Sequence, residues 1–254
     1  MDIMKIKSMK GKEAIVVLTC YDYSTAKILE EEGVDIILVG DSLGNVVLGY
    51  DSTQEVTMND MIRHTGAVRR GAVSSFIVSD MPYKSDDTTD LAVKNANMLI
   101  DAGADAVKVE GKPNIVRALV QNEIAVMGHI GHLPQTKKPM VHRDFKELLT
   151  EAEALQNSGA FAVVLEMVQS EISQKLTDFL DIPTIGIGAG AYCDGQVLVI
   201  NDILGMFEDF KPRFVKRYAK INDEIRKSVR AYKKDVRKGE FPDEEHSFND
   251  KIIK

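Results

Sequence analysis

The sequence has few cysteines and no long apolar run. Its 254 residues include only two cysteines, Cys20 and Cys193, and these do not form a CxxC pair. That number and spacing give neither a disulfide framework nor a thiolate metal site, so we expect a reducing, cytoplasmic setting. No apolar stretch reaches the length of a membrane span, and the first residues lack the apolar core of a signal peptide. A soluble cytosolic protein is therefore expected.

A net positive charge is also lacking. The formal net charge is -7 at pH 7, and the pI is near 5.3. A nucleic-acid-binding protein needs a basic face, so this class is disfavoured, and small molecules are the expected partners. Hydrophobic residues make up 44% of the chain, enough to bury one large α/β barrel core or the cores of two domains. Because no linker-like segment interrupts the sequence, we expect one domain over residues 1–254.

Short apolar runs alternate with amphipathic segments along most of the chain. Eight such alternations in a chain of this length favour a (β/α)8 TIM barrel over an open sheet. Gly103 and Gly159 each stand where a predicted helix stops before the next strand. Residues 211–238 predict an amphipathic outer helix, and residues 240–254 an extended arm. The predicted strands are 14–18, 36–39, 75–79, 106–109, 125–127, 162–166, 183–186 and 197–200.

Four carboxylates follow or end four of these apolar runs. They are Asp41, Asp80, Glu110 and Glu166. The carboxyl ends of parallel strands meet at one mouth of a barrel, where ligands bind, so the four side chains are expected to converge there. Alternation along a strand puts Lys108 on the same face as Glu110, and by the same rule places Asp41 with residues 37 and 39. A buried lysine and glutamate are costly unless they pair or act on a ligand.

Oxygen donors without clustered histidines or cysteines suit a hard divalent cation. We therefore expect three of the four acids to hold Mg2+, with open positions for water or substrate, and the fourth to move a proton; zinc is disfavoured.

Structural alternatives remain for each residue. An Asp or Ser after a strand often only caps a helix or forms an Asx turn. Lys108 and Glu110 can form an interior ion pair, and His129 can support a ligand or act directly.

Two further features have more than one interpretation. Tyr21 is expected to pack or donate a hydrogen bond at the rim of the mouth. Gly186, Gly188 and Gly190 lie where barrels often bind phosphate, but close packing of the main chain explains such glycines equally well.

Taken together, the motifs closely resemble those of the ketopantoate hydroxymethyltransferase family. Single pieces are weak, but their ordered set is specific and spans nearly the whole chain. The segments that carry the resemblance are 21–24, 39–44, 51–53, 64–71, 80–83, 107–111, 128–131, 185–190, 194–196 and 244–248.

The resemblance implies an activity and a role for each matching residue. The activity is transfer of a hydroxymethyl group from 5,10-methylenetetrahydrofolate to 3-methyl-2-oxobutanoate, giving 2-dehydropantoate for pantothenate synthesis. It implies Mg2+ held by Asp41, Asp80 and Glu110, which chelates the keto acid and stabilises its enolate. Glu166 matches the proton acceptor. Substrate binding falls on Asp41, Asp80, Ser42 and Lys108, and the assembly is expected to be a homo-oligomer, a decamer in the family.

One segment departs from the family's pattern. Relatives continue Gly-His-Leu-Gly-Leu-Thr-Pro-Gln, whereas this chain has His132-Leu133-Pro134-Gln135 after Gly131, and the loop that follows is shortened to about residues 136–143. In the family that loop covers the mouth, so its shortening leaves the metal ligands and the base intact but leaves lid closure, folate capture and substrate identity open for this chain. Two alternatives therefore stay open: a Mg2+-dependent lyase or mutase of the phosphoenolpyruvate mutase type, and a non-catalytic keto-acid-binding paralogue.

Overall fold

A closed barrel of eight parallel strands forms the centre of the fold. In the computed structural model, which describes residues 1–135, 140–209 and 212–248, each strand pairs with the next and β8 pairs with β1, so the predicted (β/α)8 barrel is confirmed. The strands are β1 (Ile15–Thr19), β2 (Ile36–Val39), β3 (Phe76–Asp80), β4 (Ala106–Glu110), β5 (Val126–Gly131), β6 (Ala162–Glu166), β7 (Thr184–Ile187) and β8 (Gly195–Leu198).

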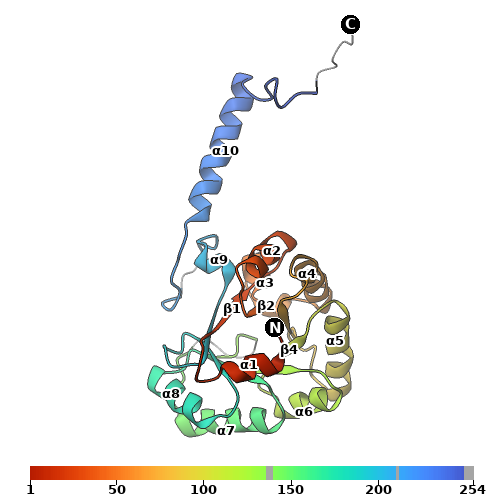
Figure 1. Ribbon diagram of the computed structural model, residues 1–254, viewed down its shortest axis with the longest axis vertical. Helices are drawn as coiled ribbons and strands as arrows, with labels where there is room; N and C mark the ends of the chain where they lie inside the picture. The colour runs from red at the N-terminus through yellow and green to blue at the C-terminus, as the bar shows by residue number, and fades with distance from the viewer. Residues whose placement is uncertain (136–139, 210–211, 249–254) are drawn as a thin grey trace. The chain divides into compact units, whose positions relative to one another are not determined.

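The helices that stand between β1 and β7 in the chain surround the sheet in order. Neighbours along the ring from α2 to α8 pack against each other, as Figure 1 shows. The helices are α1 (Ile3–Met9), α2 (Tyr23–Glu31), α3 (Leu43–Val46), the 3-10 helix η1 (Thr53–Glu55), α4 (Met58–Gly71), α5 (Thr89–Asp101), α6 (Pro113–Gln121), α7 (Phe145–Asn157), α8 (Ser170–Phe179), α9 (Ile200–Ile203) and α10 (Ile221–Lys238).

The helix boundaries follow local chemistry. Asp22, Thr57, Thr88 and Asp144 each accept a main-chain N–H bond as N-caps of α2, α4, α5 and α7. Gly103 and Gly159, after α5 and α7, have φ of +115° and +99°. A residue with a side chain is strained in that region, so both glycines end their helices as predicted.

The barrel interior is filled by alternate residues of the strands. One buried apolar cluster includes Ile36 and Leu38 of β2 and also Ile6 and Met9 of α1. Lys10, directly after α1, lies 2.9 Å from the Asp194 carboxylate, which also accepts a bond from the main chain at the start of β7. Helix α1, which precedes the first predicted element, therefore closes the N-terminal end of the barrel. The other end is left for the site.

Three sequence expectations need correction. Strand β8 runs over Gly195–Leu198, two residues before the predicted 197–200, because Gly195 pairs with both β1 and β7. The outer helix begins at Ile221 and not near residue 211. The residues on β2 that line the barrel core are Ile36 and Leu38, so residues 37 and 39 face outward, opposite to the predicted parity.

The chain divides into two compact units. The first comprises residues 1–200 with 212–215, and the second residues 201–211 with 216–254. Within the second unit, α10 is amphipathic as predicted and buries no residue. The main-chain N–H of Tyr218 donates to the Ile203 carbonyl at the end of α9. Residues 240–248 of the predicted arm contain no helix or strand, and its last six residues lie outside the described part of the chain.

Candidate active site

Side chains that face the barrel interior change from apolar to polar at the carboxyl ends of four strands. On β3, Phe76 and Val78 belong to the core, and Asp80 is next on that face; β6 follows the same pattern with Glu166. Register then brings neighbours together, since Asp80 pairs with the lysine of β4, and Glu110 with the histidine of β5. The inward-facing polar residues of these four strands are Asp80, Lys108, Glu110, His129 and Glu166.

Asp41 and Ser42 reach the same mouth from the turn after β2. The N–H of Asp41 donates to Asp80 Oδ2 at 3.0 Å, and the Ser42 hydroxyl lies 2.8 Å from Tyr21 Oη. Ser42 makes no side-chain cap bond to α3, so the capping interpretation does not account for it. Asp41 reaches the mouth because the turn carries it there, and not because of strand parity. Tyr21 is buried and forms the expected hydrogen bond, with Ser42.

Lys108 is the buried cation of the site. Its Nζ lies 3.2 Å from Asp80 Oδ1 and 3.4 Å from His129 Nδ1, and its side chain is 8% exposed. Burial by itself lowers the pKa of this amine, but the carboxylates of Asp80, Glu110 and Asp41 outweigh burial and raise the pKa above the ordinary lysine value. Lys108 is therefore charged at neutral pH, and its closest acidic partner is Asp80 on the adjacent strand.

Negative charge exceeds positive charge among these buried groups. Burial raises the pKa of Asp41 to about 7, and repulsion from Asp80 adds to the rise. Burial raises the pKa of Glu110 to about 8, against the attraction of Lys108. Burial and mutual repulsion therefore keep these carboxyls partly protonated at neutral pH. A divalent cation would replace those protons, and oxygen donors suit a hard cation.

The arrangement of donors also limits how such a cation can bind. Across the residues that the structure describes, no group of three or more His, Cys, Asp or Glu side chains forms a ready metal cage. Mg2+ characteristically keeps several waters and takes only a few protein ligands, so a complete protein cage is not a requirement for it.

Glu166 and His129 form a second pair beside the acids. His129 Nε2 lies 3.3 Å from Glu166 Oε2, and the Glu166 side chain is 15% exposed, more than those of Asp80 or Glu110. Burial lowers the pKa of His129, and the charge of Lys108 lowers it further, so the imidazole is neutral at pH 7. Glu166 thus lies at the open end of the barrel beside a neutral imidazole.

Glycine is required beside Glu166. Gly131 pairs with Glu166 in the register of β5 and β6 and has φ of +89°. A Cβ on Gly131 would overlap the Glu166 carbonyl oxygen. The same carbonyl accepts a 2.9 Å bond from His132 N. The glycine therefore allows the main chain of β5 to approach the residue that carries the carboxylate.

The glycine run after β7 is explained by packing. A Cβ on Gly188 would lie 2.8 Å from the Phe214 ring, and one on Gly190 would overlap Ser170. Both glycines also have positive φ. Close approach of protein atoms, which was one of the two interpretations of this run, accounts for it.

Gln135 belongs to the site but had no signal in the sequence. Its Nε2 donates to Asp41 Oδ2 at 2.8 Å and to the Met81 carbonyl at 2.9 Å. Its own carbonyl accepts a 2.7 Å bond from Gln54 Nε2. A glutamine after a proline in a loop looks like any polar surface residue, and only the fold brings it to an acid 94 positions away.

The shortened segment is described in part. Residues 136–139 lie outside the described part of the chain. After them, His142 N donates to the Met167 carbonyl at 2.8 Å, and His142 O accepts from Gln169 N at 3.0 Å. The segment therefore returns to the barrel immediately beyond Glu166.

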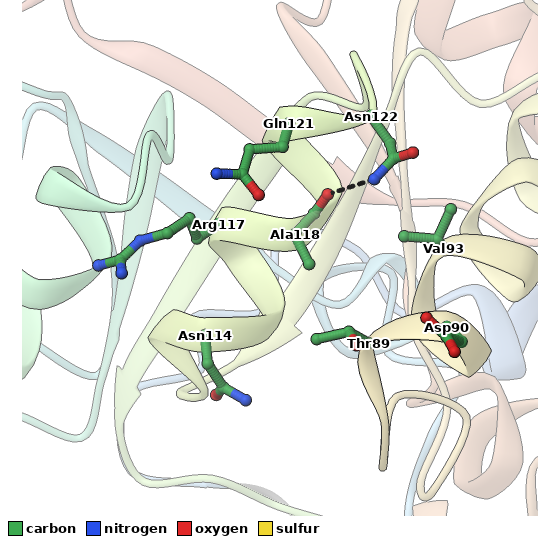
Figure 2. Close-up of a pocket in the computed structure, with 8 residues that line it drawn as sticks. All are labelled: Thr89, Asp90, Val93, Asn114, Arg117, Ala118, Gln121 and Asn122. Atoms are coloured by element: carbon green, nitrogen blue, oxygen red, sulfur yellow. Dashed lines mark hydrogen bonds between the residues drawn. The ribbon is translucent and has the colours of Figure 1, made fainter.

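A separate pocket lies on the outside of the barrel. Figure 2 shows that residues of α5 and α6 and the residue after α6 line it, with Asn122 Nδ2 bonded to the Ala118 carbonyl at 2.8 Å. None of the polar residues at the barrel mouth contributes to this lining. Its remaining lining residues are Thr89, Asp90, Val93, Asn114, Arg117 and Gln121.

The sequence model of the ketopantoate hydroxymethyltransferase family matches residues 1–244. The chain belongs to this family. It is 48% identical to 3-methyl-2-oxobutanoate hydroxymethyltransferase of Thermotoga maritima over 263 aligned positions, which cover 99% of this chain and 97% of the relative. The enzyme of the same name from Thermosipho melanesiensis is 50% identical, with 98% of each chain covered. Since 263 positions exceed 254 residues by nine, the Thermotoga relative has at least nine residues without a counterpart here.

Solved structures share the barrel at much lower identity. Phosphoenolpyruvate phosphomutase from Streptomyces platensis superposes with a TM-score of 0.64 at 15% identity, covering 94% of this chain and 88% of that one. A 2,3-dimethylmalate lyase has a TM-score of 0.62 at 15% identity, with 99% and 91% covered. At this identity the likeness establishes the fold, so membership of the transferase family decides against the lyase or mutase alternative. No helix among the described residues is long and apolar enough to cross a membrane.

Proposed function

We propose that this chain transfers a hydroxymethyl group to 3-methyl-2-oxobutanoate, the activity that its family and its full-length relatives are named for. It is a hydroxymethyltransferase of pantothenate biosynthesis, and that chemistry requires a one-carbon donor, 5,10-methylenetetrahydrofolate. The observation that carries the proposal is the separation of charge at the barrel mouth. Three acids and a lysine gather around β2 to β4, while the carboxylate of Glu166 stands apart on β6.

The three acids are the proposed Mg2+ ligands. Asp41, Asp80 and Glu110 are all buried, and their excess negative charge favours a divalent cation that keeps water in its shell. A divalent cation held by these three residues would supply Lewis-acid stabilisation of the negative charge that develops when the keto acid loses its proton. A cation held by these carboxylates would also orient the substrate. We therefore assign Asp41 and Asp80 to the substrate site as well.

Lys108 and Ser42 are the proposed substrate-binding groups. Lys108 remains charged beside Asp80, and its amine attracts the carboxylate of the keto acid. The Ser42 hydroxyl is fixed by Tyr21 and can exchange a hydrogen bond with a substrate oxygen. Both side chains therefore bind and orient the anion before any bond changes.

Glu166 is the proposed base. It accepts the C3 proton of the keto acid, and the electron pair of that C–H bond enters the enolate. C3 then bonds to the methylene carbon of the folate while the carbon–nitrogen bond breaks, and tetrahydrofolate leaves with the proton on its nitrogen. Neutral His129, with Nε2 3.3 Å from Glu166 Oε2, lies beside the carboxylate without adding positive charge to it.

The proposal also covers the setting of the enzyme. We infer one catalytic barrel with a C-terminal helix and arm, acting in the cytoplasm on small molecules as a homo-oligomer, the decamer implied by the family. Analytical ultracentrifugation of the full chain tests the assembly. A monomer at all concentrations would contradict it.

The direct test is a screen of 2-oxo acids with purified protein and Mg2+, with and without methylenetetrahydrofolate, followed by proton NMR. We expect 2-dehydropantoate only when 3-methyl-2-oxobutanoate and the folate are both present. Cleavage or rearrangement of any 2-oxo acid without folate would instead support lyase or mutase chemistry. Binding without turnover, measured by calorimetry, would indicate a keto-acid-binding paralogue.

A further inference from the structure

Gln135 touches two of the three proposed metal ligands from outside the barrel strands. Its Nε2 lies 2.8 Å from Asp41 Oδ2, and its main-chain N lies 3.4 Å from Glu110 Oε2. Gln135 is 5% exposed, and both carboxylates are also buried. One residue of the loop after β5 thus joins acids that come from β2 and β4.

The amide orientation is fixed by its surroundings. Nε2 of Gln135 faces two acceptors, the Asp41 carboxylate and the Met81 carbonyl at 2.9 Å. Since an oxygen there would face two other oxygens, the nitrogen must occupy this position and both of its hydrogens are used. The amide therefore acts as a donor with one defined geometry.

The main chain of Gln135 is fixed as well. Gln54 Nε2, in η1, donates to the Gln135 carbonyl at 2.7 Å. The Gln135 amide bonds to Oδ2 of the Asp41 carboxylate, and Oδ1 is the oxygen that we assign to the cation. Carboxylate ligands of metal sites are commonly held in this way, by a hydrogen bond from a residue behind them.

We propose that Gln135 is a positioning residue that holds Asp41 and Glu110 in the geometry that binds the metal. This inference rests on the proposed function, because it takes these two acids as metal ligands. Gln135 orients both side chains before the cation arrives, and its loop is thereby attached to the metal site.

The test is the affinity of chelator-treated full-length protein for Mg2+, measured by calorimetry and repeated with Mn2+ by electron paramagnetic resonance. Gln135→Met removes the amide at nearly constant length, and we expect about 10- to 100-fold weaker binding, the usual cost of losing a partner of a metal ligand. Gln54→Met leaves the amide in place, so a smaller loss in the same direction is expected.

Gln156→Met is the matched control. Gln156 also contacts a carboxylate, with Nε2 3.4 Å from Asp181 Oδ2, and its Oε1 accepts from Asp181 N at 2.8 Å, away from the barrel mouth. We expect it to lower the melting temperature but to leave Mg2+ affinity unchanged. If Gln135→Met does not fold, Gln135→Asn serves instead, because an amide one methylene shorter cannot span the same contacts.

The outcomes separate the two levels of the proposal. Wild-type affinity in Gln135→Met would overturn the positioning role, and tighter binding would mean that the amide obstructs the cation. Either result leaves the metal site intact if Asp41→Asn abolishes binding in the same assay. Absence of Mg2+ binding by the wild type, or binding unaffected by Asp41→Asn, would overturn the metal site itself and the role of Gln135 with it.

Discussion

Lys108 stands opposite Asp80 in the register of β3 and β4, with its Nζ 3.2 Å from Oδ1. Both side chains are buried, so neither charge is stabilised by water. Such a pair contributes little compared with well-packed apolar residues, but removing one partner leaves the other charge uncompensated. The pair therefore joins the proposed substrate-binding lysine to a proposed metal ligand.

Lys108→Met is expected to destabilise the metal-free protein by about 3–5 kcal/mol, the range for breaking a buried ion pair. Urea denaturation in the presence of a chelator measures it. Lys27→Met is the control, because Lys27 pairs with Glu31 at 4.0 Å with both side chains about 60% exposed. Exposed pairs contribute at most about 1 kcal/mol, so equal losses in the two variants would contradict the account of Lys108.

Gly131→Ala is expected to disturb Glu166 as well as stability. The new Cβ would overlap the Glu166 carbonyl, in addition to the left-handed strain of roughly 1–2 kcal/mol. Gly33→Ala carries the strain alone, since Gly33 has φ of +71° and no atom lies within 4 Å of the place that a methyl group on it would take.

Urea denaturation and turnover together check this comparison. We expect Gly131→Ala to lose more stability than Gly33→Ala and to lose most of its turnover, while Gly33→Ala stays active. Full activity in both variants would show that the close approach of β5 does not position Glu166.

The N-terminus of α4 predicts a pH-dependent contribution to stability. Thr57 and Asp60 form a capping box, and the hydrogen bond from Thr57 holds the pKa of Asp60 below its usual value. A carboxyl with a lowered folded-state pKa stabilises the fold above its unfolded pKa, and this stabilisation disappears as pH falls through the folded pKa. Thr57→Ala should cost about 1 kcal/mol at pH 7 and less at acid pH.

Thr88→Ala provides the comparison, because Thr88 caps α5 through a single bond to Leu91 N. Thermal denaturation of both variants across pH measures the difference. If the loss of stability in Thr57→Ala does not become smaller as pH falls, the role given to Asp60 is contradicted.

Cys193 is expected to be a slow nucleophile in the folded protein. Burial raises the pKa of its thiol from 9.0 to about 11. This rise in pKa makes the thiolate population at pH 8 about 100-fold smaller than in the unfolded chain. Because the thiolate is the nucleophile, alkylation should be about 100-fold slower in the folded protein. Iodoacetamide labelling followed by mass spectrometry, with and without urea, measures both rates. Equal rates would contradict the buried environment of the thiol.

Much of this site could be predicted from sequence because the positions of its residues follow from patterns within single strands. An acid at the end of an apolar run marks the carboxyl end of a strand, and period-two alternation correctly placed Lys108, Glu110 and Glu166 on the inner face. Asp41 was placed at the mouth for the wrong reason, since it follows the strand and belongs to a turn. Alternation ceases to apply once the strand has ended.

The remaining features depend on contacts between distant residues. Gln135 meets Asp41 only because the barrel closes, and no local pattern encodes that distance. Helix α1 was overlooked because its apolar residues Ile6 and Met9 are embedded among lysines, and only the open end of a barrel gives them a place to pack. Strand β8 was shifted because its first residue is a glycine, which carries no apolar signal.

The central claim is that Glu166 removes the C3 proton of the keto acid. The measurement that tests it most directly is a proton NMR time course of 3-methyl-2-oxobutanoate in deuterated buffer with Mg2+, comparing the wild type with Glu166→Gln. The account predicts loss of the C3 proton signal with the wild type and at least about 100-fold slower exchange with the variant, at unchanged Mg2+ affinity. Exchange at the wild-type rate in Glu166→Gln would contradict it.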